Sequence, residues 1–203
     1  MTQLPGQEQV DKPSNWNVPN ALTSLRLLLV PVFGYFLLAQ SGQNETYRLI
    51  AAGIFVIASI TDYFDGYLAR RNNLVTSFGK IADPIADKAL TGLALIGMSI
   101  LAILPWWVTI VILGRELLVT LIRFAVIKDG VIPASRGGKA KTVSQMLAIL
   151  LYLLPLSGYW LILPAVVMGI AVVLTVVTGI DYVARALSVR RGAQLRREAF
   201  DEN

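Results

Sequence analysis

The sequence contains neither cysteine nor histidine in its 203 residues. Their absence excludes disulfides, thiolate nucleophiles, the usual zinc sites, Ser-His-Asp triads, and haem held by either residue. It also removes the side chain that most often moves protons near neutral pH. Acid–base and metal chemistry must therefore rest on Asp, Glu, Lys, Tyr or backbone groups, and oxygen-rich ligand sets suit Mg²⁺, Mn²⁺ or Ca²⁺.

Charged residues are also scarce. They make up only 15% of the chain, while 55% of the residues are hydrophobic; an average soluble domain has about 25% charged residues. A soluble domain of this size could not cover its surface with so few charges, so the composition indicates an integral membrane protein. The net charge of +5 is better explained by loops that face anionic lipid than by nucleic acid, which we do not expect as a partner.

Six apolar stretches follow one another along the chain, and a stretch of about 20 apolar residues can cross a bilayer. They predict an all-α integral membrane protein with six transmembrane helices. The predicted spans cover residues 21–40, 49–68, 89–104, 106–127, 143–156 and 159–183. The chain then divides into a polar N-terminal interfacial segment (1–16), a six-helix domain (17–184) and a basic/acidic cytoplasmic tail (185–203). We expect the tail to form a helix at the membrane surface that continues the last span.

Lysine and arginine are unevenly distributed among the connections. Thirteen of the 18 lie in the N-terminal segment, the second-to-third and fourth-to-fifth connections, and the tail, whereas the three alternate connections contain only Arg48. The positive-inside rule then places both termini in the cytoplasm. We therefore expect a multi-pass protein of the cell (plasma) membrane whose basic connections face the cytoplasm.

Two groups of aspartates lie at helical spacing near the cytoplasmic end of the predicted bundle. The first group is Asp62 and Asp65, which share one helical face with the small residues Gly66 and Ala69. The second group is Asp83 and Asp87. Four desolvated carboxylates repel one another, and one or two divalent cations would resolve that repulsion. This pattern predicts a metal site open to a phosphate-bearing substrate, with Arg70 at the phosphate. The alternative is that the aspartates pair with Arg70, Lys80 and Lys88.

The complete pattern is Asp62-x2-Asp65-Gly66-x2-Ala69-Arg70-x8-Gly79-x3-Asp83-x3-Asp87. It resembles, without departure, the signature of the CDP-alcohol phosphatidyltransferases. The resemblance implies six transmembrane helices, a cytoplasm-facing site, a homodimer, and transfer of the phosphatidyl group of CDP-diacylglycerol to an alcohol with release of CMP. It also implies that the four aspartates surround one or two ions, Mg²⁺ or Mn²⁺. The residues implied to contact the CDP portion are Asp62, Gly66, Ala69, Arg70 and Gly79.

The resemblance makes Asp87 the candidate general base of this reaction. We expect direct displacement of CMP, because a covalent histidine intermediate is impossible in a chain without histidine. Two cations could neutralise the pyrophosphate and stabilise the departing CMP phosphate.

A second group of charged residues could bind a phosphate on the acceptor alcohol. It comprises Arg115 in the fourth predicted span together with Arg136, Lys139 and Lys141 in a predicted glycine-containing loop over residues 135–142. An ordinary positive-inside loop is the alternative for the last three residues, and a buried acid such as Glu116 is an alternative partner for Arg115.

Further patterns are similar to those of family members whose acceptor is glycerol 3-phosphate. They are Asn17-x-Pro19-Asn20-x-Leu22-Thr23-x2-Arg26, Gly114-Arg115-Glu116 and Lys139-x-Lys141-Thr142. On this resemblance, Thr23 and Arg26 line the site, although a helix cap and a snorkelling side chain would also explain them. Arg123, eight residues after Arg115 and roughly on its face, is a further candidate lining residue.

Other acceptors and another class of protein stay open at this point. Inositol 1-phosphate would need a similar phosphate pocket, and phosphatidylglycerol would give cardiolipin. A membrane transporter or a lipid-binding scaffold could use the same polar cluster. Release of CMP from CDP-diacylglycerol would separate the enzyme from these two classes.

Overall fold

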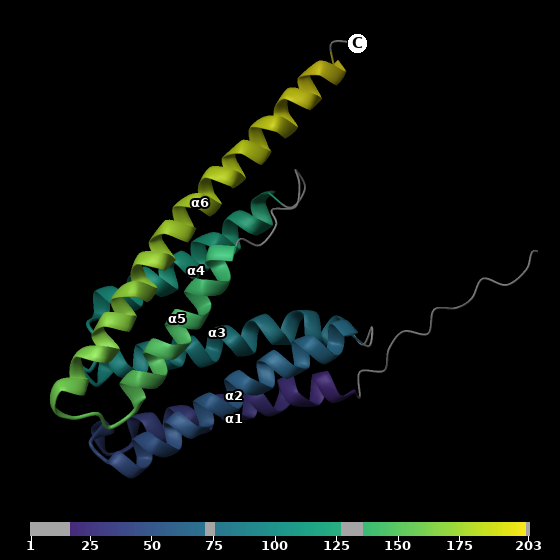
Figure 1. Cartoon of the computed structure of the whole chain (residues 1–203). Coiled ribbons are helices and arrows are strands. Elements are labelled where there is room, and N and C mark those ends of the chain that lie inside the picture. The colour runs from purple at the N-terminus through teal and green to yellow at the C-terminus, as the bar shows by residue number, and fades with distance from the viewer. Residues whose placement is uncertain (1–16, 72–75, 127–135, 202–203) are drawn as a thin grey trace, which may run out of the picture.

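The computed structural model describes residues 17–71, 76–126 and 136–201, and every regular element within these ranges is helical. The predicted all-α fold is confirmed (Figure 1). The elements are α1 (Val18–Leu38), η1 (Ala39–Gly42), α2 (Glu45–Arg71), α3 (Ser77–Ile100), α4 (Trp106–Val126), α5 (Arg136–Leu153), η2 (Gly158–Leu161) and α6 (Ile162–Asp201).

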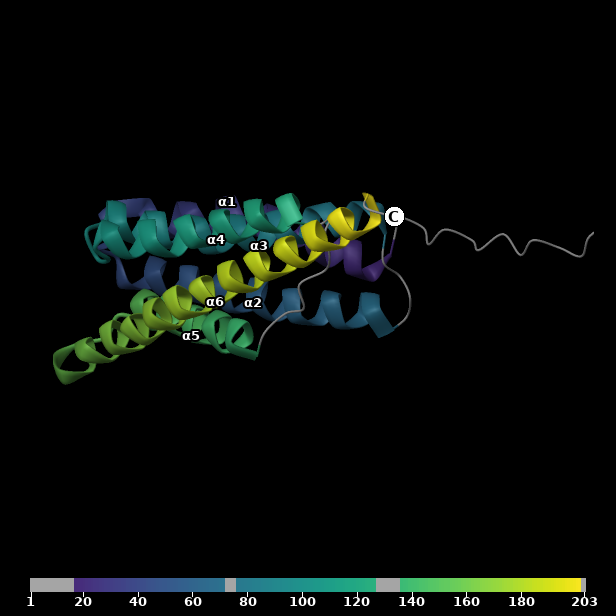
Figure 2. The ribbon, with the colours of Figure 1, turned by 90° about the horizontal axis from the view of Figure 1, so that it is seen from above.

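Successive α-helices run in opposite directions (Figures 1 and 2). The short turns that join α1 to α2, α3 to α4 and α5 to α6 lie at one end of the molecule. The beginning of α1 and the end of α6 point toward the other end, which also contains the end of α2, the beginning of α3 and the beginning of α5. The two predicted groups of polar site residues are therefore carried by the same end of the fold.

The α-helices form two three-helix units. In the first unit α1 packs against α2 and α3, and in the second unit α6 packs against α4 and α5. Contacts between the units are sparser and join α2 to α5 and α3 to both α4 and α5. One apolar core nevertheless runs through both units, and its buried side chains include Phe33, Phe55, Leu95, Ile112, Ile149 and Met168.

Side-chain caps fix the first turns of α1 and α3. The Asn17 side chain accepts a hydrogen bond from the backbone N–H of Asn20, and the Thr76 side chain accepts one from that of Gly79. The Thr76 hydroxyl also donates to Asn20 Oδ1 at 2.9 Å. The caps therefore start each helix at a defined residue and tie the two starts together.

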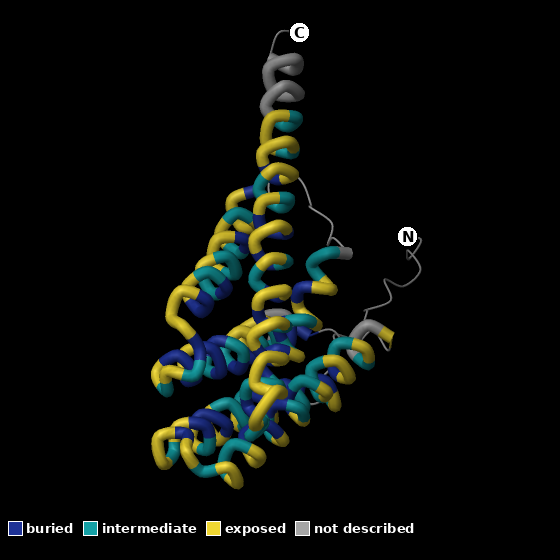
Figure 3. The backbone as a smooth tube through the Cα atoms, turned by 60° about the vertical axis from the view of Figure 1, so that its left-hand side comes forward, coloured by how far each residue is buried: buried dark blue, intermediate teal, exposed yellow. Residues whose placement is uncertain are grey.

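Three helices within the described ranges are long and apolar enough to cross a membrane: Val18–Gly42, Glu45–Leu68 and Gly158–Ala193. Large apolar side chains are also exposed on all six α-helices, as expected where a surface faces lipid rather than water; Figure 3 shows how exposed and buried positions alternate along the backbone. These findings support a membrane protein. Six crossings and cytoplasmic termini remain predictions, as does the division into regions 1–16, 17–184 and 185–203.

The predicted loop over residues 135–142 is wrong from Arg136 onward, because α5 begins there. Two glycines weaken a helix by about 1 kcal/mol each, so local propensity alone favours a loop. In the structure Lys141 is buried and contacts Glu116 of α4, and this tertiary contact holds the first turns of α5 in place. The last span and the predicted tail form one continuous helix, α6, which runs to Asp201.

Candidate functional site

Three of the four predicted aspartates meet side chains from α1. The guanidinium of Arg26 forms ion pairs with Asp62, at 2.5 Å, and with Asp65, and it is completely buried. The hydroxyl of Thr23 donates to Asp83 at 2.5 Å and lies 3.4 Å from Asp65. Asp62 and Asp65 come from α2 and Asp83 comes from α3, so two residues of α1 join the acidic groups of both neighbouring helices.

Helical spacing explains how these five side chains, the aspartate cluster, come together. Thr23 and Arg26 are three residues apart on α1, and Asp62 and Asp65 are three apart on α2, so each pair projects from one face. Close packing of α1 against α2 and α3 turns these faces toward one another. Thr23 and Arg26 therefore lie among the predicted aspartates, and the helix-cap alternative for Thr23 is wrong because Asn17 caps α1.

Arg26 neutralises charge that we expected Arg70, Lys80 and Lys88 or a metal ion to neutralise. Lys88 instead donates a hydrogen bond to the hydroxyl of Thr120 on α4. The side chains of Arg70 and Lys80 lie outside the described residues. The two carboxylates offset part of the cost of burying the Arg26 guanidinium, and loss of any one partner would leave a charge uncompensated.

The donor atoms of the aspartate cluster fit a hard divalent cation, since carboxylate and hydroxyl oxygens are the ligands that Mg²⁺ and Mn²⁺ prefer. As the side chains stand, no three acidic residues in the described ranges surround one point as ligands. The Arg26 guanidinium lies between Asp62 and Asp65, where the predicted cation would make its contacts. Binding of a cation by both carboxylates would require Arg26 to turn away from at least one of them.

Gly79 lies where the start of α3 meets the start of α1. A Cβ atom added there would lie 3.0 Å from Asn20 Oδ1, 3.4 Å from Thr76 Oγ1 and 3.7 Å from Asp83 Oδ2. Only a glycine leaves these oxygens undisturbed. Gly66 is half-buried on α2, and the side chain of Ala69 lies outside those that the structure describes.

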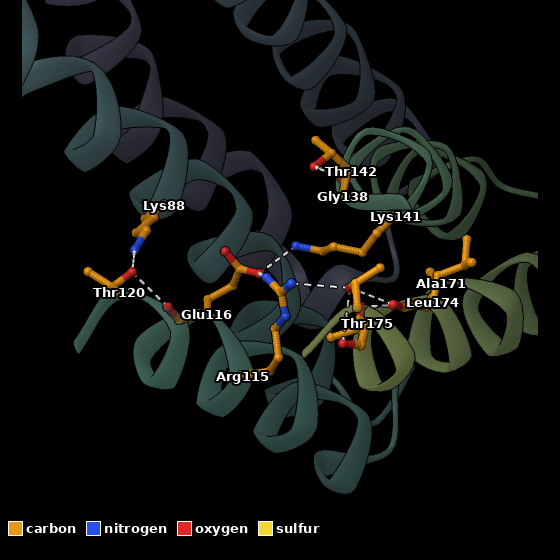
Figure 4. Close-up of polar contacts among 11 residues, drawn as sticks. Lys88, Arg115, Glu116, Thr120, Gly138, Lys141, Thr142, Ala171, Leu174 and Thr175 are labelled. Carbon is orange, nitrogen blue, oxygen red and sulfur yellow. Dashed lines mark hydrogen bonds and ion pairs between the residues drawn. The ribbon is translucent and has the colours of Figure 1, made fainter. Parts of the chain in front are cut away.

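The second predicted group converges on an acidic residue of α4. Arg115 and Lys141 both contact Oε1 of Glu116, at 2.8 and 2.5 Å (Figure 4). Arg115 also donates to the hydroxyl of Thr178 on α6 at 3.1 Å, and Gly179 leaves room for its stem. The alternative that Arg115 pairs with Glu116 is confirmed, and Lys141 joins the same pair from α5.

A pocket of about 190 Å³, the central pocket, opens between α3, α4 and α5. Its polar lining residues include Asp87, Thr91, Glu116, Lys141 and Gln145. Asp87, the fourth predicted aspartate, therefore faces a space that also contains the cationic end of Lys141. Of the other three aspartates, Asp62 and Asp65 of α2 pair with Arg26, and Asp83, one helical turn before Asp87 on α3, accepts a hydrogen bond from Thr23.

The remaining predicted residues stand apart from these contacts or outside the description. Lys139 is exposed on α5, and Arg123 is exposed on α4 two turns beyond Arg115. The side chain of Arg136 lies outside the described residues. The structure thus brings Arg115 and Lys141 together and leaves Lys139 and Arg123 away from the central pocket.

Sequence reasoning missed Glu116 and Gln145 as site residues. Glu116 was visible only as an alternative partner for Arg115, although an acid beside an arginine in an apolar stretch is itself an unusual signal. Gln145 follows Lys141 by one helical turn, and this spacing would have placed both side chains on one face of a helix. The mistaken loop over 135–142 hid that relation.

Comparison with known proteins gives a consistent result. The family model described as CDP-alcohol phosphatidyltransferase matches residues 16–177. The chain is 57% identical to a "probable phosphatidylglycerophosphate synthase" of Mycobacterium tuberculosis (strain H37Rv), over 84% of this chain and 82% of the relative. Proteins named CDP-diacylglycerol–glycerol-3-phosphate 3-phosphatidyltransferase are also similar. That of Rickettsia felis is 42% identical over 82% of this chain and 93% of its own length. That of Bacillus subtilis is 39% identical over 84% and 95%. This chain therefore belongs to the CDP-alcohol phosphatidyltransferase family.

Proposed function

We propose that this enzyme transfers the phosphatidyl group of CDP-diacylglycerol to glycerol 3-phosphate, giving phosphatidylglycerophosphate and CMP. The observation that carries the proposal is the position of Asp87 in the central pocket together with Lys141. A carboxylate that can take a proton and a cation that can hold a phosphate line the same space. The relatives named for this reaction match more than four-fifths of the chain, which supports glycerol 3-phosphate as the acceptor.

Asp87 acts as the general base in this proposal. Its carboxylate takes the proton from the acceptor hydroxyl as the hydroxyl oxygen forms a bond to the β-phosphorus, which carries the diacylglycerol. The bond from that phosphorus to the bridging oxygen breaks, and its electron pair leaves with CMP. Aspartate is a weak base, with an ordinary pKa of about 3.9, so the proton moves late, as the new P–O bond forms. A single displacement of this kind inverts the configuration at phosphorus.

Asp62, Asp65, Asp83 and Asp87 would hold one or two divalent cations, Mg²⁺ or Mn²⁺. A bound cation would neutralise the pyrophosphate and stabilise the negative charge of the leaving CMP. The oxygen donor set of the aspartate cluster supports this assignment. Gly66, Ala69, Arg70 and Gly79 are proposed, with Asp62, to contact the CDP portion by their match to the family signature.

The phosphate of the acceptor would bind Lys141 and Arg115. Both cations already contact Glu116, so a phosphate in the central pocket must share them with this carboxylate or displace it. Arg136 and Lys139, in the first turn of α5, are the other proposed members of this group; Lys139 is exposed outside the pocket lining and would have to turn toward the phosphate. We place the enzyme in the plasma membrane as a homodimer, with the site facing the cytoplasm.

The test is CMP release by purified enzyme supplied with CDP-diacylglycerol, Mg²⁺ or Mn²⁺, and one acceptor at a time. The acceptors are glycerol 3-phosphate, inositol 1-phosphate, serine and phosphatidylglycerol. We expect turnover with glycerol 3-phosphate, and we expect Asp87→Asn to lose about 10²–10⁴-fold in kcat, the usual contribution of a general base. Asp181→Asn is the matched control, because Asp181 pairs with Arg185 on α6 at a partly exposed position.

Turnover with another acceptor only would keep the enzyme family but contradict the assignment of glycerol 3-phosphate to the central pocket. Absence of CMP release with every acceptor, in folded and lipid-supplied protein, would contradict the proposal. Equal loss of activity in the Asp87 and Asp181 variants would remove the base assignment.

A further inference from the structure

Gln145 lies on α5 in the wall of the central pocket and is 4% exposed. Its side-chain oxygen Oε1 has no hydrogen-bond partner among the described residues. A buried carbonyl oxygen without a donor is costly, and nearly all such groups in folded proteins are satisfied. The mechanism proposed above gives Gln145 no role, so its unpaired oxygen requires a separate explanation.

The neighbours of Gln145 limit what could satisfy it. Lys141 lies one turn before it on the same helix face, and its ammonium group is bound to Glu116. Asp87 lies across the pocket on α3. An ionised carboxylate offers no donor, and neither does a fully ionised phosphate. A ligand that pairs with Oε1 must therefore bring an O–H or N–H donor in addition to its phosphate, and the acceptor alcohol brings hydroxyl groups.

We propose that Gln145 accepts a hydrogen bond from a non-reacting hydroxyl of the acceptor and thereby selects a polyol phosphate. The inference rests on the proposed function, because it assigns the acceptor to the central pocket. The phosphate lies at Lys141, the reacting hydroxyl lies at Asp87, and the hydroxyl on the adjacent carbon lies at Gln145. Gln145 is then a specificity-determining residue that recognises the C2 hydroxyl of glycerol 3-phosphate.

This assignment distinguishes a pocket that recognises only a phosphate from one that also recognises a hydroxyl group of the same molecule. A pocket that offered only Lys141 and Asp87 to the acceptor would take any short alcohol that carries a phosphate. A site that hydrogen-bonds a substrate hydroxyl discriminates against an analogue without it, because the protein group is then left unpaired. The relevant analogue is 3-hydroxypropyl phosphate, which keeps the phosphate and the reacting hydroxyl of glycerol 3-phosphate and lacks only the C2 hydroxyl.

The experiment compares kcat/KM for CMP release with these two acceptors in the wild-type enzyme and in variants. We expect the wild-type enzyme to prefer glycerol 3-phosphate by at least about tenfold, as one satisfied hydrogen bond allows. Gln145→Met conserves volume and removes the amide oxygen, so the preference should fall to within about threefold. Gln145→Glu keeps an acceptor oxygen; its added charge should weaken both substrates alike and leave the preference intact.

Ser144→Ala, next to Gln145 on α5 but outside the pocket lining, is the control and should keep the wild-type preference. Equal kcat/KM values for the two acceptors in the wild-type enzyme would overturn the inference without any variant, and would leave water as the partner of Gln145. An unchanged preference in folded Gln145→Met would overturn it as well. In both cases the proposed function would stand. No CMP release from the wild-type enzyme with glycerol 3-phosphate would overturn both.

Discussion

At the scale of single residues, Arg26 is the side chain on which the charge balance of the aspartate cluster depends. It is completely buried and pairs with two carboxylates of α2. Loss of one member of such a buried group leaves an uncompensated charge, which lowers the free energy of unfolding by about 3–5 kcal/mol. Arg26 is therefore a structural tie between α1 and α2.

Gly79 gives a prediction at the same scale. Substitution by alanine would place a Cβ atom 3.0 Å from Asn20 Oδ1. That oxygen is held by the Thr76 hydroxyl and cannot move freely. We expect Gly79→Ala to lower stability by about 1–3 kcal/mol, the usual cost of overpacking, as measured by thermal unfolding in detergent.

Gly53→Ala on α2 is the matched control, because an added Cβ atom there meets nothing within 4 Å. Its stability should stay unchanged or rise, by up to about 1 kcal/mol from helix propensity. Similar unfolding temperatures for the two variants would contradict the close approach at Gly79.

At the scale of elements, the two three-helix units are joined by few polar contacts, and Arg48 makes one of them. Its guanidinium, at the start of α2, donates to the backbone carbonyls of Tyr152 and Leu154 at 2.8 and 3.0 Å. These carbonyls lie at and just beyond the end of α5, where helical N–H groups run out; the Leu154 carbonyl also accepts from the N–H of Leu156 at 2.8 Å. Arg48 therefore caps α5 from the other unit.

We expect Arg48→Met to destabilise the protein by about 1–3 kcal/mol, because two carbonyls lose a charged donor. Denaturant unfolding in detergent would measure the change. Arg185→Met is the matched control: Arg185 pairs with Asp181 within α6 at a partly exposed position, and such pairs contribute roughly 0–1 kcal/mol. An equally small effect at Arg48 would show that the cap does not hold the units together.

Local and long-range parts of the site differed in how far the sequence predicted them. The spacing of Asp62 and Asp65 predicted a shared face, since three residues make nearly one helical turn. Arg26 is 39 residues from Asp65 and 36 residues from Asp62, and no local pattern encodes ion pairs over such separations. At α5 the local pattern gave a wrong prediction. Gly137 and Gly138 favour a loop locally, but the contact of Lys141 with α4 stabilises a helix.

At the scale of the whole molecule, α6 connects the two ends of the fold. Ser157 precedes it and Ser188 is exposed in its second half, about 46 Å further along at 1.5 Å per residue. This separation exceeds the hydrocarbon thickness of a bilayer, about 30 Å. The positive-inside rule places Ser188 in the cytoplasm and Ser157 outside.

The chain has no cysteine, so Ser157→Cys and Ser188→Cys each introduce a unique thiol. In intact cells a membrane-impermeant maleimide should label Ser157→Cys alone, and Ser188→Cys should react only after permeabilisation. The unaltered protein is the control and should not react. Labelling of both variants from the same side would contradict the predicted orientation.

The length of α6 has a consequence for where the enzyme resides in its membrane. At 1.5 Å per residue its 40 residues span about 60 Å, which exceeds the hydrocarbon layer, and in the predicted orientation Arg185, Arg190 and Arg191 would lie at the cytoplasmic surface. Each such cation gains about 1 kcal/mol beside anionic headgroups. Phosphatidylglycerophosphate is itself anionic. Under the proposed function, every turnover replaces anionic CDP-diacylglycerol by a lipid whose terminal phosphate monoester, when fully ionised, carries one more negative charge. We therefore expect the enzyme to be retained where its product has accumulated.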